Sequence, residues 1–248
     1  MKKICIFANQ KGGVGKTACA LNVGFELARR GRRVLLVDTD PQGNLTSWAG
    51  FDPDSFELTL FDIFKNRMLL DEVMLHVRDD LWLAPANILL ASTEREIFAS
   101  IGYERILKKA LIPVLDRFDH IILDSPPSLG ALTVNGLVAS DEVYITVACE
   151  HLSVIGTNKL LETIEAIKEN YNPNLEVGRV IPTMYSNTVL ANEMLKQLTS
   201  FFGEKLARTV IRRNVKIGES SAMGQSVIHY DPASIGALDY AALVEEIL

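Results

Sequence analysis

Short, continuously hydrophobic runs alternate along the chain with longer stretches of helical period. The runs are residues 4–8, 34–37, 121–123, 143–148 and 177–182. Strands that are buried on both faces of a parallel sheet are hydrophobic at every position, as these runs are. The alternation predicts an α/β fold, with a doubly wound, mostly parallel sheet and helices on both of its faces.

The first two runs enclose a stretch with a clear helical pattern. Ala20, Val23 and Leu27 recur at helical spacing, and Gly31 follows as a stop signal. Strand, turn, helix and strand therefore open the chain as a βαβ unit.

The remaining pattern is less regular in the middle of the chain. A weak strand is predicted at residues 81–84, and helices are predicted at 59–65, 93–100, 103–116, 153–170, 189–202 and 234–248. No Gly/Ser-rich linker or repeat interrupts the pattern, so the sequence predicts a single domain over residues 1–248.

Composition narrows the class of protein. The 248 residues are 48% hydrophobic, and 25 Lys and Arg stand against 31 Asp and Glu, a net charge of −6. Such a chain can bury a core without disulfide or metal support. The acidic balance argues against constitutive coating of nucleic acid, which requires cations that neutralise phosphates. Three widely spaced cysteines, and no run long enough for a secretory signal or a membrane span, predict a cytoplasmic location.

A glycine-rich segment, residues 9–17, lies between the first strand and the first helix. Its backbone N–H groups and the following helix N-terminus are suited to cradle an anion. Lys16 would reach the β- and γ-phosphates of a nucleotide, and the Thr17 hydroxyl would ligate Mg²⁺. Gln10 stands where the strict P-loop has glycine, so the loop is a variant.

Three carboxylates follow predicted strands. Asp38 and Asp40 come directly after residues 34–37, and Asp124 ends the run at 121–123. The carboxyl ends of parallel strands are where open α/β sheets bind ligands, and Asp124 occupies the position of a carboxylate that holds Mg²⁺ or its water. Spacing alone does not separate the roles of Asp38 and Asp40.

Residues 11–17 (KGGVGKT), 37–44 (VDTDPQGN) and 122–130 (ILDSPPSLG) resemble the deviant Walker A, A′ and B motifs of the ParA/Soj group, within the ParA/MinD family of P-loop ATPases. The resemblance spans the whole chain. It implies an ATP- and Mg²⁺-dependent homodimer that binds double-stranded DNA non-specifically, joins the nucleoid in its ATP state, and segregates or positions a chromosome, plasmid or other cargo. A ParB-like adaptor would stimulate its slow hydrolysis.

The resemblance also assigns roles to residues. Lys11 would reach across the dimer to the partner's nucleotide, Lys16 would act within its own subunit, and Asp40 would orient the attacking water. Thr17, Asp38 and Asp124 form the magnesium set. The ATP contacts would be Lys11, Gly12, Gly13, Val14, Gly15, Lys16, Thr17, Ala18, Thr183, Met184, Arg212 and Asn214.

A basic segment, residues 205–216, carries five positive charges and no acid. The rest of the chain has 20 basic and 31 acidic residues, a balance of −11. A solvated basic face is the ordinary explanation, but in this family DNA contacts occur at such a place. Asn187 stands where some relatives carry a DNA-binding Arg. The candidate DNA contacts are Lys205, Arg208, Arg212, Arg213 and Lys216.

Three other readings remain open. A membrane-positioning ATPase of the MinD type would need a basic amphipathic helix near the C-terminus, whereas residues 241–248 are acidic. An iron–sulfur carrier would need cysteines at a dimer interface, whereas Cys5 and Cys19 fall in a strand and a helix. A small-molecule ligase or kinase shares the P-loop architecture, but it needs neither Lys11 nor the basic segment.

Overall fold

Seven strands form one sheet in the computed structural model, which describes residues 3–98, 100–150 and 155–247. The strands are β1 (Lys3–Ala8), β2 (Val34–Asp38), β3 (Leu75–Arg78), β4 (Leu81–Ala84), β5 (His120–Asp124), β6 (Glu142–Ala148) and β7 (Glu176–Thr183). Their order across the sheet is β3-β4-β2-β5-β1-β6-β7. All neighbours run parallel except β3, which pairs antiparallel with β4. The predicted fold class is confirmed.

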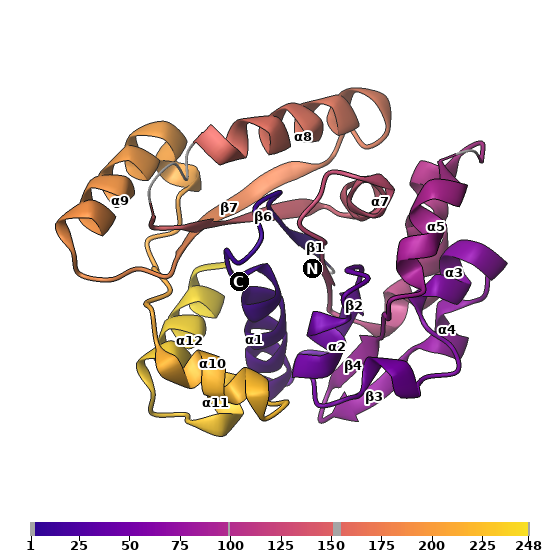
Figure 1. Cartoon of the computed structure of the whole chain (residues 1–248), viewed down its shortest axis with the longest axis horizontal. Helices are drawn as coiled ribbons and strands as arrows, with labels where there is room; N and C mark the ends of the chain where they lie inside the picture. Colours follow the sequence, from indigo (N-terminus) through magenta and orange to yellow (C-terminus); the bar gives the residue numbers. More distant parts are fainter. Residues whose placement is uncertain (1–2, 99, 151–154, 248) are drawn as a thin grey trace.

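Two layers of helices cover the sheet (Figure 1). Their bounds are α1 (Lys16–Arg29), α2 (Asn44–Trp48), α3 (Leu60–Asn66), α4 (Leu70–Val73), α5 (Leu90–Ile97), α6 (Ile106–Leu111), α7 (Ala131–Ala139), α8 (Asn158–Asn170), α9 (Val189–Phe202), α10 (Val215–Ala222), α11 (Val227–Tyr230) and α12 (Ile235–Ile247). Short 3₁₀ turns are η1 (Pro53–Ser55), η2 (Tyr103–Arg105), η3 (Ile112–Arg117), η4 (Ile155–Thr157) and η5 (Gly203–Lys205).

Each sheet face has its own hydrophobic cluster, because alternate side chains of a strand point to opposite faces. In β1, Ile6 and Ala8 pack with residues of α3, α6, α7 and α8. Cys5 and Phe7 pack with residues of α1, α11 and α12 on the other face. The central strands are therefore buried on both sides, which explains their continuous hydrophobicity.

Local signals set several helix boundaries. The predicted helix 189–202 is confirmed as α9: the Thr188 hydroxyl accepts a hydrogen bond from Ala191 N, and Gly203 ends the helix at a φ of 55°. The predicted helix 59–65 appears as α3, where Thr59 and Asp62 form a capping box.

Other predicted boundaries differ from the structure. The helix predicted at 103–116 is broken into η2, α6 and η3, and Pro113, which lacks an N–H donor, lies at the start of η3. The helix predicted at 93–100 is α5, which begins at Leu90. The predicted helix 153–170 corresponds to α8, and its predicted start at residue 153 lies outside the described residues. Strand 81–84 is confirmed, but its half-exposed partner β3 was not predicted.

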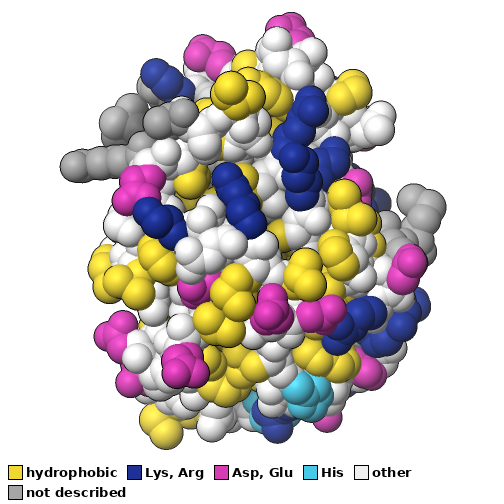
Figure 2. All heavy atoms as spheres, turned by 90° about the vertical axis from the view of Figure 1, so that its right-hand side faces the viewer, with side chains coloured by type: hydrophobic (Ala, Val, Ile, Leu, Met, Phe, Trp, Pro, Cys, Tyr) yellow, Lys and Arg dark blue, Asp and Glu magenta, His cyan; other side chains and the backbone are white. Residues whose placement is uncertain are grey.

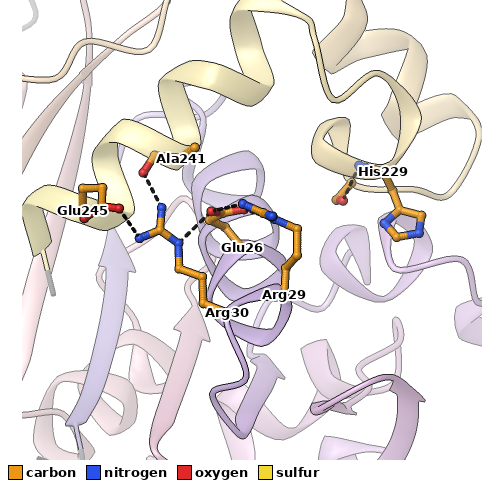
Figure 3. Close-up of polar contacts among 7 residues, drawn as sticks. Glu26, Arg29, Arg30, His229, Ala241 and Glu245 are labelled. Carbon is orange, nitrogen blue, oxygen red and sulfur yellow. Dashed lines mark hydrogen bonds and ion pairs between the residues drawn. The ribbon is translucent and has the colours of Figure 1, made fainter.

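A buried carboxylate joins α1 to α12. Glu26 lies between Arg29 and Arg30, and Arg30 also donates to Glu245 and to the Ala241 carbonyl of α12 (Figure 3). Burial acts to raise the pKa of Glu26, but the hydrogen bonds from Arg29 and Arg30 outweigh it, so its pKa lies below the usual value. The helix that follows the glycine-rich loop is thus fixed to the C-terminal helix by charge as well as by packing.

Candidate functional site

The glycine-rich loop connects β1 to α1 and turns through two left-handed residues. Gly13 and Gly15 have φ values of 71° and 85°, a region that glycine enters without strain. A Cβ built on Gly15 would lie 3.6 Å from Thr183 Cγ2 of β7. Gly15 caps α1 without a side-chain acceptor, so the first N–H groups of this helix have no such partner from their cap. The loop therefore offers backbone donors to an anion.

The side chains of Asn9, directly after β1, and of Thr183, at the end of β7, hold the loop in place. Asn9 donates to the Thr146 carbonyl at 2.7 Å, and its Oδ1 accepts from Lys11 N at 3.0 Å. The Thr183 hydroxyl donates to the Val14 carbonyl at 2.9 Å. These contacts hold the loop at its start and near its middle.

Lys16 and Lys11 have opposite environments. The Lys16 side chain is buried, with its Nζ donating to the Lys11 carbonyl at 3.3 Å. Burial lowers the pKa of Lys16, while Asp124 and Asp40 act to raise it. Lys11 is exposed at the tip of the loop. Lys16 is therefore buried in the site of its own chain, whereas the side chain of Lys11 is exposed to solvent.

Asp38, at the end of β2, is fully buried and held by protein donors. Its Oδ2 accepts from Thr46 N at 2.9 Å and from the Thr46 hydroxyl at 2.7 Å, and its Oδ1 accepts from Asp40 N at 3.2 Å. Burial raises the pKa of Asp38 to about 7, although the Thr46 bonds oppose the shift. This carboxylate therefore anchors the start of α2.

Asp124 pairs with Asp38 in the sheet register, but its surroundings differ. Both carboxylate oxygens are buried, and neither has a hydrogen-bond partner among the described residues. Burial and Asp38 raise the pKa of Asp124 well above its usual range; Thr17 and Lys16 oppose this, although the Thr17 hydroxyl does not reach hydrogen-bonding geometry. Unpartnered buried oxygens beside a lysine and a threonine fit a cation or its bound water.

The described residues contain no group of three or more His, Cys, Asp or Glu side chains arranged to hold a metal ion. Mg²⁺ does not require one, because it is usually held by one or two carboxylates together with substrate phosphates and water. The residues present therefore fit Mg²⁺ bound along with a nucleotide, and they do not form an all-protein metal cage.

A cavity of about 530 Å³ lies beside the loop. It brings together the glycine-rich loop, Asp40, the predicted nucleotide contacts Thr183 and Met184, and residues 211–214, which include the predicted contacts Arg212 and Asn214. Asp40 accepts a hydrogen bond from Gln42 N at 3.0 Å and faces the cavity, which separates it structurally from Asp38. The predicted residues that line it are Gly12, Gly13, Gly15, Lys16, Thr17, Ala18, Asp40, Thr183, Met184, Arg212 and Asn214. Of the other predicted nucleotide and magnesium residues, Lys11, Val14, Asp38 and Asp124 do not line it.

Several walls of the cavity were not predicted. Helix α2 contributes Asn44, Ser47 and Trp48, and Trp48 Nε1 donates to the Gln225 carbonyl beyond α10 at 2.9 Å. Tyr240 of α12 also lines the cavity. No local pattern marks Ser47, Trp48 or Tyr240, whereas Asn44 is the last residue of the motif at residues 37–44. The remaining unpredicted lining residues are Pro127, Ile211, Arg213, Ile217, Gly218 and Ser221.

In the folded protein, the surface formed by the basic segment carries less positive charge than the count within residues 205–216 suggests. Carboxylates from elsewhere neutralise three of its charges: Arg212 pairs with Asp239, Arg213 pairs with Glu150, and Lys216 pairs with Glu219. The local charge of +5 that the segment has in the sequence is therefore not the charge of the folded surface. Lys205 and Arg208 are exposed beside a second cavity, and neither side chain makes an ion pair within residues 3–98, 100–150 and 155–247.

The three cysteines are buried. Burial raises the pKa of the Cys19 thiol to about 12 and that of Cys149 to about 11, and it raises the pKa of Cys5 still further. These thiols stay protonated at neutral pH, unlike the thiolates that ligate iron–sulfur clusters.

Comparison with known proteins identifies the family. The family model described as "AAA domain" matches residues 1–177. The chain is 41% identical to the sporulation initiation inhibitor protein Soj of Bacillus subtilis and 40% identical to the chromosome-partitioning ATPase Soj of Treponema pallidum. Each alignment covers 100% of this chain and 98% of the relative.

Solved structures with the same fold include nucleotide complexes. The cobyrinic acid a,c-diamide synthase of Mycobacterium smegmatis with bound ATP analog and magnesium has a TM-score of 0.87 at 33% identity, covering 99% of this chain and 93% of that one. MinD from Pyrococcus horikoshii with Mg-ADP shares the fold, with a TM-score of 0.81 at 21% identity and coverage of 100% and 96%.

The fold, the loop and these relatives define a P-loop ATPase that uses ATP and Mg²⁺, which confirms the predicted enzyme class and cofactors. Within this class the chain belongs to the Soj/ParA family of chromosome-partitioning ATPases.

Proposed function

We propose that the chain forms an ATP-dependent homodimer that binds non-specific double-stranded DNA in its ATP state. A ParB-like adaptor would stimulate slow hydrolysis and link the switch to a cargo. The observation that carries this proposal is the contrast between the two lysines of the loop. Lys16 is buried in its own site, whereas Lys11 has a fixed backbone and an exposed side chain, as a group acting on a partner's nucleotide requires.

In the proposed ATP site, the loop N–H groups and Lys16 neutralise the phosphates, and Lys11 of the second subunit completes the site. Phosphoryl transfer depends mainly on such positioning and charge neutralisation. Mg²⁺, held at this site, would supply positive charge against the phosphates. The Thr17 hydroxyl and the unpartnered Asp124 oxygens would hold it directly or through water.

Asp40 is the proposed residue that orients the attacking water, because it faces the cavity. Asp38 would act indirectly: its oxygens already accept bonds from Thr46 and Asp40, so it holds the segment that carries Asp40. This assignment modifies the sequence-based magnesium set by moving Asp38 from a ligand to a supporting position.

For DNA binding, Lys205 and Arg208 are the strongest candidates, because their side chains are exposed and unpaired within the described residues. Lys216 and Arg213 would have to exchange their carboxylate partners for phosphates. On the face made by α3, α4, α5 and β3, Figure 2 shows basic side chains among acidic and hydrophobic ones. Two copies of a small patch would bind DNA far better than one.

Sedimentation with non-specific duplex DNA in Mg-ATP, in Mg-ADP and without nucleotide tests the proposal. We expect retention with Mg-ATP alone, falling steeply with added salt. A Lys205→Ala, Arg208→Ala double variant should lose retention. The matched control removes the same charge from the exposed surface of α6 through Lys108→Ala and Lys109→Ala, and it should bind like the parent. Equal retention of DNA in Mg-ATP and Mg-ADP would refute the proposed dependence of DNA binding on ATP.

The alternative functions predict different outcomes. A MinD-like membrane mode would need a free amphipathic helix, whereas the apolar side of α12 is buried against α1. None of the helices in the described parts of the chain has the length and apolar character needed to cross a bilayer. A small-molecule ligase, the class to which the Mycobacterium smegmatis neighbour belongs by name, would show no DNA retention in any nucleotide state. We expect the protein in the cytoplasm, on the nucleoid when ATP is bound.

A further inference from the structure

Helices α2 and α10 each form part of the wall of the cavity beside the glycine-rich loop, and they are joined to each other at their C-terminal ends. Trp48, the last residue of α2, lines the cavity, and so does Ser221 of α10. Trp48 Nε1 donates to the carbonyl of Gln225, three residues after the end of α10, at 2.9 Å. A hydrogen bond therefore connects two parts of the cavity wall that lie far apart in the sequence.

The backbones of the two segments also touch next to this bond. A Cβ built on Gly224 would lie 2.9 Å from Gly50 Cα, and a Cβ built on Gly50 would lie 3.0 Å from the Gly224 carbonyl oxygen. Gly50 and Gly224 have φ values of 98° and 62°, a region that glycine enters without strain. The absence of a side chain at both positions is therefore what allows the chain after α2 to approach the chain after α10.

Both helices are fixed near their N-terminal ends. In α2, the N–H and the hydroxyl of Thr46 donate to the buried Asp38. In α10, Ile217 packs closely against α12, where a Cβ built on Gly236 would lie 2.9 Å from Ile217 Cγ1. Movement of α2 or α10 is therefore expected at the C-terminal ends, where the two helices are joined.

The joined ends bury little apolar surface. Gly50 and Gln225 are exposed, Met223 is 62% exposed, and Trp48 is half-buried. Segments with few buried apolar contacts open locally at a small cost in free energy. The hydrogen bond from Trp48 is therefore a substantial part of what holds the two ends together.

We propose that Trp48 and the Gln225 carbonyl form a latch, and that nucleotide enters and leaves the cavity when the ends of α2 and α10 separate. The inference rests on the proposed use of this cavity for ATP. The hydrogen bond joins two protein groups, so its strength should be the same before and after nucleotide binds. Weakening the latch should therefore raise the association and dissociation rates by the same factor and leave Kd unchanged.

Stopped-flow fluorescence with the methylanthraniloyl derivative of ADP and Mg²⁺ measures both rates, the dissociation rate by displacement with excess ADP. Trp48→Phe keeps an aromatic ring in the cavity wall but lacks the N–H donor. Both rates should rise about 2- to 10-fold, the range for one hydrogen bond, with Kd within about twofold of the parent value. Trp82→Phe is the matched control and should keep the parental rates, because Trp82 lies in β4 and packs against the rings of His76 and Phe118.

A second pair of variants tests the latch from its other side. Gly224→Ala places a methyl group against the backbone of Gly50, so it should push the two ends apart and also raise both rates. Gly31→Ala is its matched control: Gly31 has a φ of 76°, but no atom of the described residues lies within 4 Å of a Cβ built there. This control carries the backbone strain without the clash and should keep the parental rates. Thermal melting checks the folding of each variant, and either pair tests the latch if a member of the other does not fold.

Three results would overturn the inference. Parental rates in Trp48→Phe would show that nucleotide passes elsewhere. Faster dissociation with unchanged association, and hence weaker binding, would make Trp48 a direct nucleotide contact. Equal acceleration in Trp82→Phe or Gly31→Ala would indicate general loosening of the fold. Failure of the parent protein to bind Mg-ATP and Mg-ADP in calorimetric titration would instead refute the proposed function itself, so the two failures are distinguishable.

Discussion

Replacing Glu26 by alanine should reveal how strongly α1 is fixed to α12. Glu26 accepts two bonds of 2.7 Å from Arg29 and a third of 2.7 Å from Arg30, and its side chain has no exposed surface. Arg30 continues the network to Glu245 and the Ala241 carbonyl (Figure 3). Removing the central carboxylate leaves two guanidinium groups without their common acceptor.

The expected loss of stability depends on how far each arginine can replace its bond to Glu26 by water or by its remaining partners. Breaking a buried pair costs about 3–5 kcal/mol when the remaining charge stays buried. Arg29 is 60% exposed and regains water, whereas Arg30 is 23% exposed and keeps its bonds to α12. We therefore expect a loss of about 2–3 kcal/mol in the free energy of unfolding, with a fall of roughly 5–10 °C in Tm for a chain of this length.

Urea denaturation followed by circular dichroism measures the loss, and its pH dependence identifies the cause. The folded-state pKa of Glu26 lies below its usual 4.5, so its contribution is complete above about pH 4.5 and disappears as pH falls through the folded value. The difference in the free energy of unfolding between the parent and Glu26→Ala should therefore shrink as the pH falls below about 4.5. A loss below about 0.5 kcal/mol at pH 7, or one that does not change with pH, would refute the electrostatic explanation.

Three further predictions concern the proposed site. Lys11→Ala should abolish hydrolysis and weaken ATP-dependent dimerisation while monomers still bind ATP; sedimentation velocity and phosphate release check this, and unchanged dimers would contradict it. Asp40→Ala should trap an ATP-bound dimer that does not turn over, so normal phosphate release would remove Asp40 from its role. Thr46→Val deletes a hydroxyl that donates to Asp38 at 2.7 Å and accepts from Ala86 N at 3.1 Å; it should cost about 1–3 kcal/mol in urea denaturation and slow hydrolysis, and wild-type values in both assays would contradict the supporting role of Asp38.

The strands and the phosphate loop could be predicted from the sequence because their signals are local. Residues 4–8 are apolar throughout since both faces of β1 are covered, and the loop glycines occupy backbone conformations that other residues avoid. Strand β3 was not predicted, because its alternation of Leu75 and Val77 with His76 and Arg78 extends over only four residues. The break at Pro113 has a local cause that the apolar period of 103–116 concealed.

The charge of the basic segment and the walls of the cavity depend on contacts between distant residues. Asp239 lies 27 positions from Arg212, and Glu150 lies 63 positions from Arg213. No pattern within residues 205–216 indicates either carboxylate. Trp48 is likewise a cavity residue only because α2 and the turn after α10 meet. The sequence predicts which residues carry the chemistry, and the fold determines which of their side chains are accessible.

The attachment of the basic segment to β7 and to Tyr185 constrains the proposed control of DNA binding by ATP. Ala207 N donates to the Val180 carbonyl, Ile211 N to Pro182 and Arg213 N to Tyr185, each at 2.8 Å. Moving Lys205 or Arg208 within one subunit would break bonds of this ladder, at about 1 kcal/mol each. We infer that ATP does not change the conformation of the basic segment but brings two copies of it together in a dimer. Doubling the phosphate contacts raises the affinity for DNA and makes it fall more steeply with salt. ATP-loaded Lys11→Ala, which should remain monomeric, should therefore retain DNA as poorly as the parent with ADP; strong retention by that monomer would show that the segment itself rearranges.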